Sequence, residues 1–250
     1  MLQLPPLSLY IHVPWCVQKC PYCDFNSHAQ KGELPHLEYV AALLEDLDLD
    51  LKWAQGRPLS SIFIGGGTPS LLTVEAMQTL LDGVRARIPL TPDCEITMEA
   101  NPGTVEADKF AGFKQAGINR ISMGVQSMDD RFLSLLGRPH RRADVLRAVE
   151  HLRAAGCRNL GVDLMWGLPG QDAAHWLDTL EDALALEPEH VSAYGLTLEE
   201  GTPLERDWSA GRLSLPEDDE QERMYLEGIR LLAAHGLEQY EISNYARPGF

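Results

Sequence analysis

Short apolar segments alternate with amphipathic segments along most of the 250-residue chain. The apolar segments are rich in β-branched or bulky side chains, which is typical of buried strands. The predicted strands cover residues 8–13, 61–66, 95–100, 120–125, 160–167 and 190–197, and a last one covers 238–243. Between them the apolar residues recur with the period of a helix, as in residues 36–53, where a leucine-rich stripe lies opposite an acidic face.

About six strand–helix units with nearly continuous apolar strands require a parallel sheet covered by helices. Both a doubly wound sheet and a barrel meet this requirement, because periodicity alone does not separate them. Helix start signals are present at Thr73 and at Ser127, where Asp130 would complete a capping box. No linker or low-complexity segment divides residues 1–250, so one α/β domain is expected.

The composition restricts the partners and the location. A chain that is 44% hydrophobic and 23% charged is ordinary for a globular protein. The formal net charge of -16 argues against broad electrostatic binding to nucleic acid. No segment approaches the roughly 18 apolar residues of a membrane span, and the chain does not start with a basic leader. A cytoplasmic location is therefore expected.

Three cysteines, Cys16, Cys20 and Cys23, lie within eight positions. This spacing is too tight to join distant parts of a fold by disulfides, and it suggests a metal site. Three thiolates on one short loop can hold three irons of a cubane 4Fe-4S cluster and leave the fourth iron open. Zinc is a second interpretation, with His12 or His28 as a fourth ligand, and unliganded thiols are a third.

A glycine-rich turn, GGGTPS, occupies residues 65–70 directly after the second predicted strand. Consecutive glycines let a ligand approach the backbone closely, although a tight turn between a strand and a helix explains the same residues. The turn lacks the Gly-Lys-Ser/Thr ending of a phosphate-binding P-loop. It predicts either a ligand cradle of another kind or a simple turn.

Together these motifs resemble the radical S-adenosylmethionine superfamily, in which CxxxCxxC follows the first strand and GGGTP follows the second. Further segments resemble its branch of oxygen-independent coproporphyrinogen III oxidases and HemW-type heme chaperones: YIHVPWC, EANPG, GVQS, LGRPH and DLMWGLPGQ. The resemblance implies a partial (β/α)6 TIM-like barrel of the radical SAM type as a core domain over residues 1–250. The family's C-terminal helical domain, and its His-Asn-x-x-Tyr-Trp segment implicated in heme handling, would follow Phe250.

The resemblance explains why the cysteine motif stops at three. In the family, the open iron is chelated by the amino and carboxylate groups of S-adenosylmethionine, and an electron from the cluster cleaves the sulfonium to methionine and a 5'-deoxyadenosyl radical. A fourth protein ligand would block this chemistry, which belongs to the cofactors. The resemblance therefore implies Cys16, Cys20 and Cys23 as cluster ligands and S-adenosylmethionine as the second cofactor.

The same resemblance implies contacts to S-adenosylmethionine at the first two strands. Tyr10, in the family's Y-x-H-x-P motif, would contact the cofactor near the cluster, and Tyr22 would shield the cluster and flank the cofactor. Gly66, Gly67 and Thr68 would bind the methionyl amino end through backbone groups and a hydroxyl. Taken singly, either tyrosine would more often be a core residue.

Four side chains from later segments complete the implied site. Glu99, Gln126 and Asp163 each fall near the carboxyl end of a predicted strand, where barrel active sites assemble; a helix cap is the alternative for a carboxylate there. Arg138 would approach the nucleoside or carboxylate region of the cofactor, with a surface ion pair as the alternative. The basic segment at 138–142 is either a solvated loop or, at the mouth of the site, a binder of tetrapyrrole propionates.

Position 25 separates the two kinds of relative. The oxidases carry CxxxCxxCxC and a longer segment before the first cysteine, whereas the HemW type has an aromatic residue at the last position, and this chain has Phe25. The resemblance implies a protein that binds heme and passes it to an unidentified acceptor. No histidine stands out as an axial heme ligand, although His12 and His140 lie nearest the expected site. Oxidative decarboxylation of coproporphyrinogen III is the first alternative, followed by a radical enzyme acting on tRNA and a structural zinc domain.

Overall fold

The computed structural model describes residues 4–104 and 107–250. Its main sheet contains six parallel strands that are adjacent in the order of the chain: β1 (Leu7–Val13), β4 (Leu59–Gly66), β5 (Leu90–Ala100), β6 (Arg120–Gln126), β7 (Leu160–Trp166) and β8 (His190–Gly195). The six predicted strands are confirmed. Because each new strand is added at the same edge, the sheet winds in one direction, as in a barrel, and is not doubly wound. The barrel is partial, with β1 at one open edge.

The opposite edge differs from the prediction. One strand was expected over residues 238–243, but only β9 (Glu238–Gln239) forms there, and the chain then turns into β10 (Asn244–Ala246). The backbone N–H of Tyr240 donates to the carbonyl of Asn244, which closes the turn, and Ile242 at its tip is 75% exposed. β10 pairs antiparallel with both β8 and β9, so the parallel sheet ends in a short antiparallel edge.

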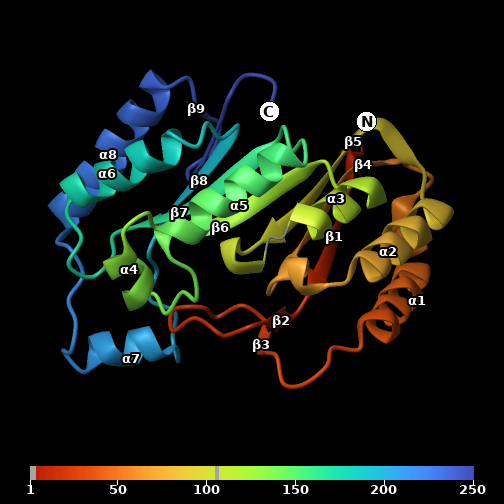
Figure 1. The fold of residues 1–250 in the computed structure, drawn as a ribbon, viewed down its shortest axis with the longest axis horizontal. Helices are drawn as coiled ribbons and strands as arrows, with labels where there is room; N and C mark the ends of the chain where they lie inside the picture. Colours follow the sequence, from red (N-terminus) through yellow and green to blue (C-terminus); the bar gives the residue numbers. More distant parts are fainter. Residues whose placement is uncertain (1–3, 105–106) are drawn as a thin grey trace.

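Helices cover the outer face of the sheet (Figure 1): α1 (His36–Ala54), α2 (Val74–Arg87), α3 (Ala107–Ala116), α5 (Arg142–Ala154), α6 (Ala173–Leu184) and α8 (Asp218–Ala234). The strands turn alternate residues toward these helices, and Ile121, Met123 and Val125 of β6 are fully buried there. The residues between them in β6 face the lumen and are polar or small. The strands are therefore less uniformly apolar than the sequence pattern indicated, because only one face belongs to the core.

Smaller elements gather beyond the carboxyl ends of the strands (Figure 1): β2 (Trp15–Cys16), β3 (His28–Ala29), η1 (Pro69–Leu71), η2 (Pro102–Thr104), α4 (Asp130–Leu135) and α7 (Pro203–Ser209). The first turn of α7 is tied to the cysteine loop, because the N–H of Leu204 donates to the carbonyl of Pro21 at 2.9 Å. No helix in the described ranges combines the length and the apolar character that a membrane span requires.

One of the two predicted helix caps is correct. Thr73 caps α2, since its hydroxyl accepts from the N–H of Ala76 at 3.1 Å. The capping box predicted at Ser127 is wrong, because Asp129 caps α4 by accepting from the N–H of Arg131. The hydroxyl of Ser127 accepts from the N–H of Asp129 instead and shapes the turn before the helix. The carboxylate at position 129 is two residues closer to the first helical N–H groups, so it reaches them first.

Candidate functional site

A cavity of about 730 Å³ lies on the lumen side of the sheet. Its size is in the range of ordinary small-molecule sites. Every residue predicted to belong to the site lines it, with the exception of Tyr10: Cys16, Cys20, Tyr22, Cys23, Gly66, Gly67, Thr68, Glu99, Gln126, Arg138 and Asp163. The fold thus brings residues from six separate segments of the chain to one cavity.

Backbone hydrogen bonds fix the cysteine loop against the glycine-rich turn. The N–H of Gly67 donates to the carbonyl of Val13, and the N–H of Thr68 donates to the carbonyl of Trp15, both at 2.7 Å. A Cβ atom at position 67 would lie 2.5 Å from the carbonyl oxygen of Trp15, so only glycine allows this approach. An incoming amino group donates hydrogen bonds, so at this turn it would bind acceptors, namely the carbonyl oxygens or the hydroxyl of Thr68.

Two carboxyl groups face the cavity from neighbouring parts of the sheet. Glu99 accepts from the N–H of Gly66 at 3.0 Å, and Asp163 accepts from the hydroxyl of Ser122 at 3.0 and 3.1 Å. Burial, followed by the charge of Asp163, raises the pKa of Glu99 to about 7. Burial also raises the pKa of Asp163. Carboxyl groups with incomplete hydration are suited to accept hydrogen bonds from a cationic or hydroxyl-bearing ligand. Neither group caps a helix, which was the alternative interpretation.

Arg138 is buried beside the cysteine loop and does not form a surface ion pair. Its Nη1 donates to the Sγ of Cys20 at 3.3 Å and its Nη2 to the carbonyl of Gly124 at 2.9 Å. Its Nε is buried and has no hydrogen-bond partner among the described residues. The structure thus places a positive charge directly beside the sulfur of one of the three predicted cluster ligands.

Tyr22 stands between the cysteine loop and a small apolar cluster. Its ring packs on the buried side chains of Phe132, Leu136, Met165 and Leu168, and its hydroxyl is 3.5 Å from Nη1 of Arg138. Burial raises the pKa of Tyr22. The position agrees with the predicted shielding role, although the ring is also part of the packing that supports the loop.

Tyr10 is the predicted site residue that the structure separates from the cavity wall. It is 56% exposed, its ring stacks on Phe63 with centroids 6.2 Å apart, and its hydroxyl is 2.9 Å from Nδ1 of His12. The Nε2 of His12 is 2.8 Å from the carbonyl of Asn26. Both nitrogens of His12 are thus engaged, one with Tyr10 and the other with the backbone of Asn26.

His140 explains why three of the sequence motifs occur together. Its Nε2 donates to the carbonyl of Val125, in GVQS, at 3.0 Å, and its Nδ1 lies 3.2 Å from the side-chain amide of Asn101, in the EANPG segment. Burial, followed by the charge of Arg138, lowers the pKa of His140 to about 4. This neutral ring joins three loops beside the cavity and was missed as a positioning residue, because a lone histidine carries no sequence signal for that role.

The basic segment at 138–142 divides between the cavity and the surface. Arg142 pairs with Asp182 at 2.7 Å, and Nη1 of Arg141 donates to the carbonyl of Asp130 at 3.1 Å. Neither side chain lines the cavity, whereas Arg138 does. Of the three arginines in this segment, Arg138 is therefore the one that could contact a propionate inside the cavity.

The cysteine loop fits an iron–sulfur cluster better than a closed zinc site. The thiols of Cys16, Cys20 and Cys23 are free, partly buried and face one cavity. His12, a candidate fourth zinc ligand, uses both ring nitrogens elsewhere. In residues 4–104 and 107–250, no three His, Cys, Asp or Glu side chains are already grouped around a point that could hold a metal ion. Ligation by the three thiols stays a prediction.

The remaining cysteines behave as expected for small apolar residues. Cys94 and Cys157 are each 7% exposed and belong to the main core. Burial raises the pKa of both thiols, which opposes metal binding or nucleophilic chemistry.

Comparison with known proteins points to one superfamily. The sequence profile of the radical SAM superfamily matches residues 10–183. The heme chaperone HemW of Escherichia coli is 56% identical over 250 residues, which are 100% of this chain and 65% of that protein. HemW of Bacillus subtilis is 40% identical over 97% of this chain and 64% of that protein. The chain thus spans about 65% of the length of these two relatives.

The fold comparison agrees. Coproporphyrinogen III oxidase (HemN) from Escherichia coli, described as a radical SAM enzyme, superposes with a TM-score of 0.85 at 27% sequence identity. The match covers 98% of this chain and 56% of that one. Because the superfamily profile covers more than half of the chain, and the cavity brings its motifs together, the chain belongs to the radical SAM superfamily and is of the HemW type by sequence.

Proposed function

We propose that this chain binds heme and passes it to an acceptor protein, as the radical SAM part of a heme chaperone. The proposal is supported above all by the similarity to HemW proteins along the entire chain, at 56% identity to the protein of Escherichia coli. Phe25 supports it as well, because it lines the cavity where the oxidases carry a further cysteine. The heme acceptor is not identified by any feature of the chain.

We assign Cys16, Cys20 and Cys23 as the ligands of one 4Fe-4S cluster, which superfamily membership implies together with S-adenosylmethionine. When bound, a cluster with one open iron supplies single-electron chemistry to S-adenosylmethionine. The protein contributes position and charge. Arg138 donates a hydrogen bond to the sulfur of Cys20, and the backbone contacts of Gly67 and Thr68 hold the loop in place.

The S-adenosylmethionine contacts follow from the polarity of the cavity wall. The amino group of the cofactor needs acceptors, which the carbonyls of the glycine turn, Thr68 and Glu99 supply. Asp163 accepts hydrogen bonds from hydroxyl groups, and Gln126 offers both a donor and an acceptor. Gln126 has a left-handed φ of 67°, a strained conformation that is typical of positions held for function.

The proposed function is tested by heme transfer from protein with a full cluster. The chain is reconstituted anaerobically, its iron and sulfide are quantified, and hemin is titrated while the Soret band is followed. Apomyoglobin is then added as a general heme scavenger. Saturable binding of one hemin per chain followed by transfer to apomyoglobin is the expected result. Absence of saturable binding by the cluster-containing protein would contradict the proposal.

The second candidate is oxygen-independent oxidation of coproporphyrinogen III. It is supported by the superposition on HemN at a TM-score of 0.85. Reductant, S-adenosylmethionine and coproporphyrinogen III are added to the reconstituted protein, and the products are separated by chromatography. Protoporphyrinogen formed in step with 5'-deoxyadenosine would favour this enzyme, whereas intact coproporphyrinogen leaves heme transfer as the function.

A further inference from the structure

The cavity continues beyond the predicted cofactor contacts toward the amino ends of the strands. Gln126 is the last residue of β6 and Arg120 is the first, and both line the cavity. A strand rises about 3.3 Å per residue, so the cavity follows β6 for roughly 20 Å. His190, the first residue of β8, lies at the same end. This amino-end part of the cavity, lined by Arg120, His190, Ser192 and Tyr240, has no role in the arrangement described so far.

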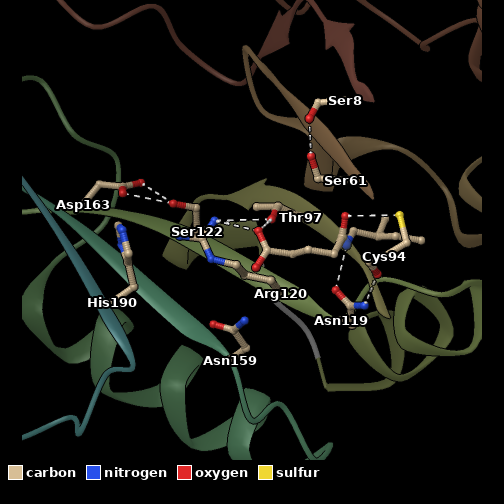
Figure 2. A network of polar contacts seen from close by, with 12 residues as sticks. Ser8, Ser61, Cys94, Thr97, Asn119, Arg120, Ser122, Asn159, Asp163 and His190 are labelled. Atoms are coloured by element: carbon tan, nitrogen blue, oxygen red, sulfur yellow. Dashed lines mark hydrogen bonds and ion pairs between the residues drawn. The ribbon is translucent and has the colours of Figure 1, made fainter. Parts of the chain in front are cut away.

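Arg120 is a mostly buried cation with weak partners. Its side chain is 12% exposed, and its Nη1 lies 3.3 Å from Oγ1 of Thr97 and 4.0 Å from Oε1 of Glu95. Charge-assisted N–H···O bonds are normally about 2.7–2.9 Å long. Among the described residues, the bond to Thr97 is the one hydrogen bond of this guanidinium. Figure 2 shows Arg120 with a dashed line to Thr97 and with Ser122, Asp163 and His190 nearby.

The other side of the guanidinium lies over Gly161, close to His190. A Cβ atom at position 161 would be 3.3 Å from Nη2 of Arg120 and 3.5 Å from Nδ1 of His190, so glycine leaves room for both groups. The Nε2 of His190 is 2.9 Å from the hydroxyl of Tyr240. Burial, followed by the charge of Arg120, lowers the pKa of His190 to about 4. The imidazole is thus neutral near pH 7 and leaves Arg120 as the local charge.

Neither nearby carboxyl group compensates that charge fully. Asp163 already accepts from the hydroxyl of Ser122 at 3.0 and 3.1 Å, and no hydrogen bond joins it to Arg120 among the described residues. The side chain of Glu95 is 46% exposed, so water screens its attraction across 4.0 Å. A guanidinium in this state retains the capacity to bind one carboxylate with two parallel N–H···O bonds.

We propose that the amino-end part of the cavity is a carboxylate-binding subsite, in which Arg120 pairs with a propionate group of a bound tetrapyrrole. The proposal rests on the proposed function for the identity of the ligand. Tyr240, whose hydroxyl contacts His190, lines this region and is 64% exposed, and Tyr194 lines the cavity four residues further along β8 and is 45% exposed. An aromatic wall beside a buried guanidinium matches a flat apolar ring that carries carboxylates at its edge.

The subsite is tested with tetrapyrroles that differ in their carboxylates. Protoporphyrin IX and its dimethyl ester are titrated into the cluster-containing protein and followed by fluorescence, and hemin is titrated in parallel by Soret absorbance. Arg120→Gln is expected to weaken binding of the acid about tenfold to a hundredfold and to leave binding of the ester within about twofold. Arg142→Gln is the matched control, because it removes a guanidinium that pairs with Asp182 outside the cavity.

A second variant, which is expected to bind more tightly, keeps the test valid even if Arg120→Gln fails to fold. Glu95→Gln takes away the competing charge while its amide oxygen can still accept from the hydroxyl of Thr97, which Glu95 now binds at 3.1 Å. We expect it to tighten binding of protoporphyrin IX about twofold to fivefold and to leave the ester unchanged. Arg120→Lys is expected to lie between wild type and Arg120→Gln, since it keeps the charge without the fork.

The outcomes separate the subsite from the proposed function. Hemin binding with equal losses for acid and ester in Arg120→Gln would overturn the subsite and leave heme binding intact. Acid-specific loss for protoporphyrin IX without any hemin binding would support the subsite and overturn the heme function. Failure of the wild-type protein to bind either tetrapyrrole would overturn both.

Discussion

The two ends of the cavity use their charged side chains in different ways. At the carboxyl end, Arg138 donates to Cys20 and to the carbonyl of Gly124, and Glu99 accepts from the backbone of Gly66. At the amino end, Arg120 has one hydrogen bond of 3.3 Å within the described part of the chain. At the first end each of these charged groups has close hydrogen bonds to the protein, whereas the guanidinium at the second end has one long bond and can still take a ligand. We therefore expect the cofactors at the first end and, under our proposal, the carboxylate of a larger ligand at the second.

The difference has a structural cause. Loops after each strand converge at the carboxyl end and bring backbone groups within reach of buried side chains. At the amino end, apart from Tyr240 in the turn after β9, the lumen residues named above belong to strands, whose backbone groups are used in the sheet ladder. A buried charge there must find another side chain, water or a ligand.

The largest expected effect is loss of the cluster from the carboxyl end. Replacing Cys20 by Ala removes one of the three proposed ligands, so iron and sulfide after anaerobic reconstitution should fall to background. Cys157→Ala is the control, because that thiol is 7% exposed and lies in the core away from the cavity. Full iron and sulfide in Cys20→Ala would contradict the assignment of the cluster to the carboxyl end of the cavity.

The second effect is a pH-dependent change of stability at Glu99. Its pKa rises from about 4.5 to about 7 on folding, so its protonated form is favoured in the folded state. The stabilisation of the folded state by protonated Glu99 is complete below pH 4.5, and it is lost as the pH rises to 7. We therefore expect Glu99→Gln to increase the free energy of unfolding by up to about 3 kcal/mol at pH 8 and to have little effect near pH 4.5.

Urea denaturation of the cluster-free chain at both pH values measures this difference. Glu95→Gln is the matched control on the same strand, since the Glu95 side chain is 46% exposed and stays hydrated in the folded state. An equal change of stability at pH 4.5 and pH 8 for Glu99→Gln would contradict burial as the cause.

A smaller effect concerns the contact between the glycine turn and the cysteine loop. Gly67→Ala would place a Cβ atom 2.5 Å from the backbone oxygen of Trp15, and we expect a loss of about 1–3 kcal/mol of stability, with weaker cluster binding. Gly103→Ala tests the same change at a cavity residue whose nearest neighbour would be 3.8 Å from the new atom. Similar destabilisation by both substitutions would argue against close packing at residue 67.

The smallest effect is expected on the outer surface. Arg142→Gln removes an ion pair with Asp182 in which both side chains are about 40% exposed or more. The loss of stability should be below about 1 kcal/mol, because water solvates both charges. Thermal unfolding compared with Arg138→Gln checks this, since loss of the buried Arg138 leaves the carbonyl of Gly124 without its donor and should cost more.

The sequence by itself determined the strands and the cofactor end of the cavity. Six strands were predictable because their outer faces carry regular apolar residues, and the cysteines and glycines were predictable because their spacing along the chain is local. The antiparallel edge after residue 238 was not predictable, because the turn closed by Tyr240 and Asn244 depends on pairing with β8. The cap at Asp129 was not predictable either, because Ser127 and Asp129 are both suitable caps and bind different N–H groups, those of Asp129 and Arg131.

Only the tertiary structure decided which residues meet. Glu99 and Gln126 lie at strand ends as predicted, whereas Asp163 lies in the middle of β7 and still lines the cavity. Tyr10 carries the same kind of motif signal and does not line the cavity. His140 joins three motifs, and Arg120 and His190 share the space over Gly161, although these residues are far apart in the chain. Such contacts depend on strand order and register, which are set by packing between segments and leave no local pattern in the sequence.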